Sequence, residues 1–232
     1  MKPILFNTES KSHLGREETK LNLAYCIDCM TALKHIPDKY FDLAVVDPPY
    51  GLPKGSSRGS GKLKSRIFHT GDIKRWDKAP DKEYFYELFR VSKNQIIWGG
   101  NYFSLPPCRC FVVWDKLQPW ENFSRCEYAW TSFNKPSKLF SFDNRTKGKI
   151  HPTQKPVELY NYLFRMFASS TDKILDTHLG SGSSRIAAYD AGLDFVGFEI
   201  SEEYFADQEK RFNEHIAQTN LFLDFNGGND NG

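Results

Sequence analysis

An alternation of strand and helix is clearest at residues 173–184, which read KILDTHLGSGSS. The run Lys173–Thr177, with Ile174 and Leu175 at its centre, is typical of a short buried strand. Glycines then allow a tight turn, and a helix is expected from about Ser183. A strand that passes through a glycine-rich turn into a helix is the repeating unit of an α/β fold.

Similar patterns flank this unit along the 232-residue chain. Further strands are expected at 22–27, 41–46, 95–98, 110–114, 127–133, 138–142 and 194–200. Helices are expected near 28–35 and 81–92, from Pro156, and after Ser201. Because no repeat or linker divides the chain, we predict one domain over residues 1–232, with a polar, flexible tail at 226–232.

Composition excludes several classes of protein. Hydrophobic residues make up 40% of the chain and charged residues 26%, which argues against a disordered protein. The longest apolar runs are far shorter than the ~18 residues of a membrane helix, and no secretory signal is visible at the start. We therefore expect a cytoplasmic protein with no membrane partner.

The five cysteines allow two interpretations. Cys26, Cys29, Cys108 and Cys110 could supply four zinc ligands, but no glycine-rich knuckle accompanies them. Free thiols in a reducing cytoplasm are the favoured interpretation, so we expect no metal site.

Positive charge is concentrated in two segments although the net charge is only +2. Residues 51–80, a Gly-, Ser- and Lys-rich stretch without periodicity, carry +6, and residues 134–155 carry +5. The remainder of the chain is therefore at −9. Two basic patches on an acidic body are typical of a surface that binds a polyanion, although two solvated loops would give the same pattern.

The tetrapeptide Asp47-Pro48-Pro49-Tyr50 follows the apolar run 41–46 directly. Ligands of open α/β sheets bind at the carboxyl ends of strands, where this sequence lies. The two prolines restrict the backbone and remove two N–H donors, which leaves a carboxylate, bare carbonyls and an aromatic face. Such a corner suits a planar amino group, whose hydrogens Asp47 and the Pro48 carbonyl could accept. The alternative is a strand-to-loop corner with a capping aspartate.

The glycine-rich turn after Asp176 predicts a nucleoside site. Glycines let the backbone approach a ligand closely, and Glu199 ends the following strand, where an acidic residue can bind ribose hydroxyls. The turn is neither a full GxGxxG sequence nor a phosphate-binding P-loop, and a simple tight turn is the alternative.

Four motifs together resemble one family. DPPY (47–50), HPTQKP (151–156), DTHLGSGSS (176–184) and FVGFEIS (195–201) are similar to motifs of the DNA amino-methyltransferases that use S-adenosylmethionine. Their order resembles the circularly permuted beta type, in which the catalytic motif precedes the cofactor loop. The resemblance implies a Rossmann-like class I methyltransferase fold whose sheet is mostly parallel with one antiparallel strand. It also implies methyl transfer to N6 of adenine or N4 of cytosine in a flipped-out base.

The resemblance also implies residue roles. The catalytic residues would be Asp47, Pro48, Pro49 and Tyr50. The cofactor residues would be Asp28, Thr153, Gln154, Lys155, Asp176, His178, Gly180, Ser181, Gly182 and Glu199. Residues expected to contact nucleic acid are Lys54, Arg58, Lys62, Lys64, Arg66, Arg145 and Lys147.

Two departures from the family pattern affect these roles. Ile27 precedes Asp28 where the family usually has glycine, and Thr177-His178 replaces the more usual Pro-Phe. His178 is interpreted as a wall of the cofactor pocket, with proton transfer as the alternative.

Adenine N6 is the favoured target, because Asp47 heads a tetrapeptide that often begins with serine in cytosine-N4 members. The alternatives are cytosine N4 methylation, methylation of RNA or a protein amide, and a nucleic-acid-binding protein without turnover.

Residues 104–150 are short for a separate recognition domain and are interpreted as a target-recognition insertion. The expected partners are DNA and, from the family, a second copy and a cognate restriction endonuclease, in a bacterial or phage setting.

Overall fold

The computed structural model describes residues 21–51, 78–121, 124–143, 145, 149–151 and 153–227, with side chains to residue 221. The strands are β1 (Asn22–Cys26), β2 (Phe41–Val46), β3 (Ser92–Trp98), β4 (Phe111–Asp115), β5 (Cys126–Thr131), β6 (Lys138–Ser141), β7 (Lys173–Asp176) and β8 (Asp194–Glu199). The helices are α1 (Cys29–Leu33), α3 (Lys82–Val91), the 3₁₀ helix η2 (Gly100–Tyr102), α4 (Val157–Phe167), α5 (Ser183–Asp190) and α6 (Glu202–Gly227).

These strands form one sheet in the order β1-β8-β7-β2-β3-β5-β4-β6. Strand β5 runs antiparallel to both its neighbours, β3 and β4, and the remaining pairs are parallel. The α/β class and the mostly parallel sheet with one antiparallel strand are therefore confirmed.

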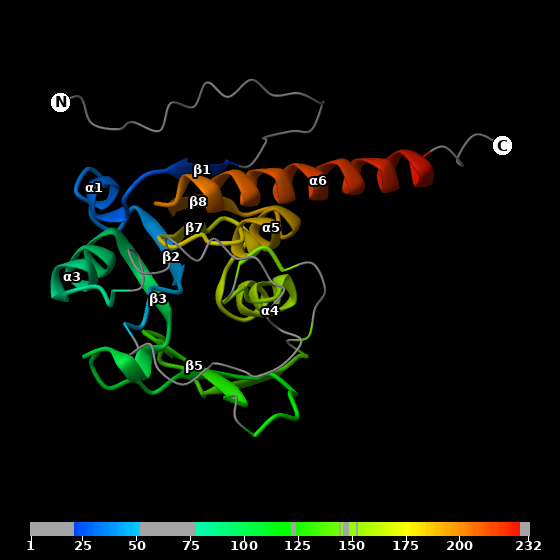
Figure 1. The fold of residues 1–232 in the computed structure, drawn as a ribbon. Coiled ribbons are helices and arrows are strands. Elements are labelled where there is room, and N and C mark those ends of the chain that lie inside the picture. The colour runs from blue at the N-terminus through cyan, green and yellow to red at the C-terminus, as the bar shows by residue number, and fades with distance from the viewer. Residues whose placement is uncertain are drawn as a thin grey trace.

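Helices cover both faces of the sheet (Figure 1). Strand β2 shows why its sequence is apolar throughout: Leu43 and Val45 pack with α4 and α5, whereas Ala44 and Val46 pack with α1 and α3. Successive side chains of a strand point to opposite faces, so both faces need apolar residues here. The long helix α6 contacts α5 and the edge strand β1.

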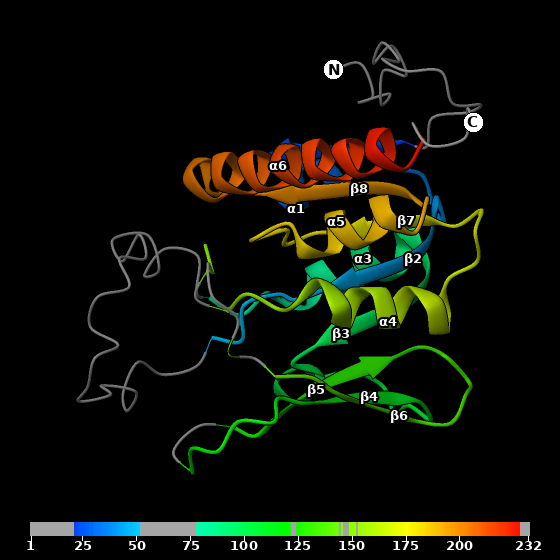
Figure 2. The same cartoon turned by 90° about the vertical axis from the view of Figure 1, so that its right-hand side faces the viewer.

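Functional residues gather where the parallel strands end. The carboxyl ends of β1, β8, β7, β2 and β3 lie at one edge of the sheet, since these strands are parallel neighbours. Figure 2 shows this edge in profile: the chain leaves β2 and enters α4 on the same side. We call it the carboxyl edge.

The expected elements agree with the structure apart from their ends. The first helix stops at Leu33, because His35 and Ile36 donate to carbonyls only three residues back, as in a 3₁₀ turn. Helix α6 continues to Gly227, two residues into the predicted tail. Most of the basic stretch 51–80 and residues 228–232 lie outside the described residues. In the part of the chain that is described, no helix has the length and apolarity to span a membrane.

Candidate active site

Asp47 lies immediately after β2 at the carboxyl edge. The Tyr50 hydroxyl donates a hydrogen bond of 2.7 Å to Asp47 Oδ1, and Lys155 Nζ donates to Asp47 Oδ2. Lys155 belongs to the HPTQKP segment, 108 positions along the chain. Both carboxylate oxygens are thus held in place, each with one accepting position still available.

Lys155 is one member of a longer chain of ion pairs. Its ammonium also lies 3.0 Å from Glu127 Oε2, and Glu127 Oε1 lies 2.6 Å from Lys116 Nζ. The Lys155 side chain is only 3% exposed and lies 5.2 Å from the centre of the Trp98 ring. Two acids and two lysines therefore alternate from Asp47 to Lys116, which balances the buried charge.

The pKa values of these groups follow from burial and from each other. Burial raises the pKa of Asp47 above its usual range, against the opposing effects of Lys155 and the Tyr50 hydroxyl. Burial also acts to raise the pKa of Glu127, but Lys155 and Lys116 lower it to about 2. Burial would lower the pKa of Lys155, yet Asp47 and Glu127 raise it, so the ammonium stays protonated.

The ring of Tyr50 is enclosed by neighbours from the β3–η2 turn. It stacks on Tyr102 with ring centres 4.9 Å apart and an interplanar angle of 22°. A Cβ on Gly99 would lie 2.2 Å from Tyr50 Cε1 and 2.6 Å from the two adjacent ring carbons. A carbon that lies 2.2 Å from one ring atom and only 2.6 Å from both of its neighbours must lie above the face of the ring. Only glycine therefore fits at position 99.

We expect Gly99→Ala to destabilise the protein by about 3 kcal/mol, because the new methyl group displaces Tyr50 and the backbone at φ +67° disfavours alanine. Urea unfolding measures this change. Gly192→Ala is the matched control: φ is +63° there and a Cβ meets nothing within 4 Å, so it should cost only about 1–2 kcal/mol. Equal losses for the two variants would contradict the proposed contact with Tyr50.

The glycine loop, Gly180–Gly182, connects β7 to α5. Gly180 and Gly182 have φ values of +52° and +72°, the left-handed region that glycine adopts readily. Glu199, at the end of β8, accepts hydrogen bonds from the backbone amides of Gly180 (2.8 Å) and Ser201 (2.9 Å). The predicted acid and the predicted loop are therefore in direct contact.

Two more predicted carboxylates lie near the ends of strands in the same part of the sheet. Asp28, just beyond the end of β1, caps helix α1 by accepting from Thr31 N at 2.9 Å. Asp176, at the end of β7, is buried and accepts from Ser184 Oγ and His178 N. Burial raises the pKa of Asp176 to about 7, while those two hydrogen bonds act to lower it.

His178 follows Asp176 at the carboxyl edge. Its Nδ1 lies 2.9 Å from Thr177 Oγ1, which in turn lies 2.7 Å from the hydroxyl of Tyr84 on α3. Burial lowers the pKa of His178 to about 4, so the ring is neutral at pH 7. The neutral ring packs edge-on against Tyr84, and its role as a wall of the cofactor pocket stays a prediction.

The HPTQKP segment spans the distance between the two halves of the site. At its start, the His151 ring would lie 3.8 Å from a Cβ on Gly180 and packs against Tyr204. Thr153 Oγ1 lies 3.1 Å from His151 Nδ1, and Gln154 Oε1 accepts from Ile150 N. At its end, Lys155 reaches Asp47 rather than the glycine loop.

The structure describes only one of the residues expected to contact nucleic acid. Arg145 is exposed and forms a 2.5 Å ion pair with Asp143. Lys54, Arg58, Lys62, Lys64, Arg66 and Lys147 lie outside the described residues. The five cysteines are free thiols, and among the described residues no cluster of three or more His, Cys, Asp or Glu side chains could hold a metal.

Glu127 and Lys116 were not predicted from the sequence. The sequence nevertheless contains an indication for Glu127. It shares a face of strand β5 with Ala129 and Thr131, both fully buried. An acid on a strand face that is otherwise buried needs a partner, and that partner is supplied by Lys116 and Lys155.

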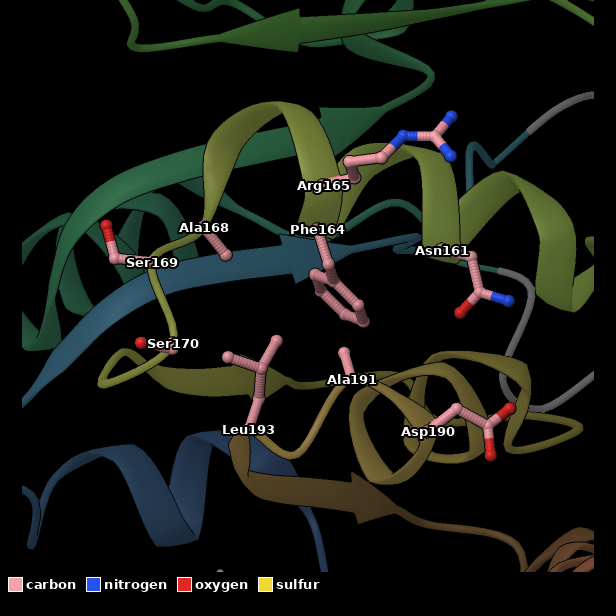
Figure 3. Close-up of a pocket in the computed structure, with 9 residues that line it drawn as sticks. All are labelled: Asn161, Phe164, Arg165, Ala168, Ser169, Ser170, Asp190, Ala191 and Leu193. Atoms are coloured by element: carbon pink, nitrogen blue, oxygen red, sulfur yellow. The ribbon is translucent and has the colours of Figure 1, made fainter. Parts of the chain in front are cut away.

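A cavity of about 440 Å³ lies away from this site (Figure 3). It is formed where α4 and α5 end and β7 and β8 begin, at the opposite edge of the sheet. Phe164 points into it toward Ala191 and Leu193, whereas Arg165 points away. None of the predicted site residues lines this cavity.

Comparison with known proteins finds similarity to DNA methyltransferases. A family model described as DNA methylase, of the N6/N4 class, matches residues 109–210, which include HPTQKP and the glycine loop. The type II methyltransferase M2.MboI of Moraxella bovis is 24% identical over an alignment of 257 residues, which covers 88% of this chain and 92% of the relative.

Two solved structures share the fold. The M1.HpyAVI–SAM complex has a TM-score of 0.54 and 20% identity, covering 82% of this chain and 98% of that one. The cytosine-N4-specific PvuII DNA methyltransferase has a TM-score of 0.55 and 15% identity, covering 85% and 92%. With its four motifs in the order described above, the chain is similar to the S-adenosylmethionine-dependent DNA amino-methyltransferases of the N6/N4 family.

Proposed function

We propose that this protein methylates N6 of adenine in DNA at a specific sequence. The observation that carries the proposal is the position of Asp47: an aspartate at the head of the tetrapeptide, held by Tyr50 and Lys155 at the carboxyl edge of β2, the strand beside β7 and its glycine loop. Aspartate rather than serine at this position favours adenine over cytosine.

The residues at the ends of β1, β8 and β7 fit S-adenosylmethionine. They offer three carboxylates, from Asp28, Asp176 and Glu199, together with the backbone of the glycine loop. Such a donor set suits a ligand that carries an ammonium group, a sulfonium centre and hydroxyl groups. Glu199 would hold the ribose hydroxyls, Asp28 the adenine amino group, and Asp176 with the glycine loop the methionine part.

When bound, S-adenosylmethionine supplies a methyl group activated by the positively charged sulfur. The chain must supply a nucleophilic amino nitrogen, because the lone pair of an exocyclic amine is delocalised into the base. Asp47 and the Pro48 carbonyl would accept the two amino hydrogens and draw the nitrogen toward a tetrahedral state. Fixing Asp47 beforehand means that little reorganisation is needed during the reaction.

Tyr50 would stack on the flipped-out base once Tyr102, which stacks on its ring in this structure, moves aside; unstacking the base from the duplex costs a few kcal/mol. Its hydroxyl bond to Asp47 links the stacking ring to the accepting carboxylate. The basic stretch 51–80 follows Tyr50 directly, which supports a role in holding the DNA strand beside the catalytic corner. Similarity to a type II methyltransferase supports a restriction–modification role with a cognate endonuclease, in the cytoplasm of a bacterium.

Transfer of tritiated methyl from S-adenosylmethionine to unmethylated genomic DNA tests this proposal, with the product nucleosides separated. We expect label in N6-methyl-2′-deoxyadenosine. Label in N4-methyl-2′-deoxycytidine would overturn the choice of base but keep the reaction. Label in neither, with the cofactor bound, would overturn DNA as the substrate, and RNA or protein amides would then be assayed side by side.

A further inference from the structure

Lys155 contacts two acids, and only one of them belongs to the tetrapeptide. Its ammonium pairs with Asp47 on one side and lies 3.0 Å from Glu127 on the other. Were Lys155 paired with Asp47 alone, its whole charge would neutralise the carboxylate that must accept the target amino group. A second acid on the same ammonium divides that charge between two carboxylates.

Lys116 also pairs with Glu127, so Glu127 interacts with two ammonium groups rather than with Lys155 alone. It lies 2.6 Å from the other Glu127 oxygen and 5.6 Å from the centre of the Trp114 ring. Both Glu127 and Lys116 are mostly buried, so their charges are poorly screened by solvent. Lys155, Glu127 and Lys116 therefore act on Asp47 with charges of alternating sign.

We propose that Glu127 is a positioning residue for methyl transfer, which shares the Lys155 ammonium with Asp47 and so keeps the catalytic carboxylate a strong acceptor. This inference rests on the proposed function of Asp47. Glu127 acts through Lys155 and need not touch the base. Its place on β5, paired with β3 and β4, fixes its distance from Lys155.

The influence of Glu127 on Asp47 has a definite sign. Burial and the negative charge of Glu127 raise the pKa of Asp47, whereas Lys155 and Tyr50 lower it. Asp47 in turn raises the pKa values of three other groups: Asp176, Tyr84 and Tyr160. Removing the Glu127 charge lowers the pKa of Asp47, and removing the Lys116 charge raises it.

Two variants with opposite expected effects test the inference. In Glu127→Gln, the pKa of Asp47 should fall, so the acid limb of kcat/KM should move to lower pH, and kcat should drop roughly tenfold. In Lys116→Gln, the acid limb should move to higher pH. Glu127→Asp should restore the wild-type profile, and Glu83→Gln, at an exposed residue 4.0 Å from Lys34, should leave it unchanged.

The pKa of Asp47 is also measured directly, by carbon NMR of labelled aspartate in the protein alone, with Asp47→Asn to assign the signal. Opposite shifts in Glu127→Gln and Lys116→Gln would support the inference. Unchanged values, or shifts in the same direction, would overturn it. Because this measurement needs no DNA, it still decides the inference if the wild-type protein fails to methylate DNA and the proposed function falls.

Discussion

Asp47→Asn is expected to lower kcat for methyl transfer about a thousandfold, equivalent to about 4 kcal/mol of transition-state stabilisation. Asparagine keeps the size of the side chain but loses the negative charge that accepts the amino hydrogens. Lys155 keeps its contact with Glu127, so the buried cation retains a partner. S-adenosylmethionine binding should stay within a few-fold of wild type, since the carboxylates and the glycine loop expected to hold it follow other strands.

Tritiated methyl transfer gives kcat, and equilibrium dialysis gives cofactor affinity. Asp42→Asn is the matched control: the same substitution on the same strand, at the end far from the carboxyl edge, where Asp42 pairs with Lys93. That variant should keep its activity. A kcat for Asp47→Asn above a tenth of the wild-type value would contradict the role given to Asp47.

Lys155→Met is expected to destabilise the folded protein by about 3–5 kcal/mol at pH 7, because it leaves the carboxylates of Asp47 and Glu127 buried without their shared cation. Activity should fall as well, since Asp47 loses a group that holds it in place. Urea unfolding at several pH values measures the stability. Lys93→Met, which breaks an exposed ion pair with Asp42, should change the stability far less than Lys155→Met.

The pH dependence of this loss follows from Glu127. Its folded-state pKa, about 2, lies below the ordinary value, so it stabilises the fold above its unfolded pKa and loses that contribution as the pH falls toward 2. Without Lys155 this contribution shrinks. The gap between wild type and variant should therefore be widest near pH 7 and should narrow below about pH 4. A gap that widens on acidification would contradict the ion-pair chain.

Much of the fold could be predicted because each buried strand has a local signature. The bounds of β2, for example, are those expected from the apolar run 41–46. The order of the strands could not be predicted, since the place of β5 between β3 and β4 depends on pairing between distant residues. Pairing between distant residues also explains why only part of the site could be predicted. Motifs indicated Asp47, Glu199 and the glycine loop, but no local pattern pairs Lys155 with Asp47 or with Glu127.

Strand β1 pairs with β8, so that Asn22 lies opposite Phe195. The expected cofactor ligands Asp28 and Glu199 therefore come from segments far apart along the chain. A growing chain can pair β2 with β3 early, but β1 has no neighbour until β8 emerges. Closing so long a loop also slows folding. The strand that precedes Asp47 thus gains its first neighbour well before the expected cofactor site can form.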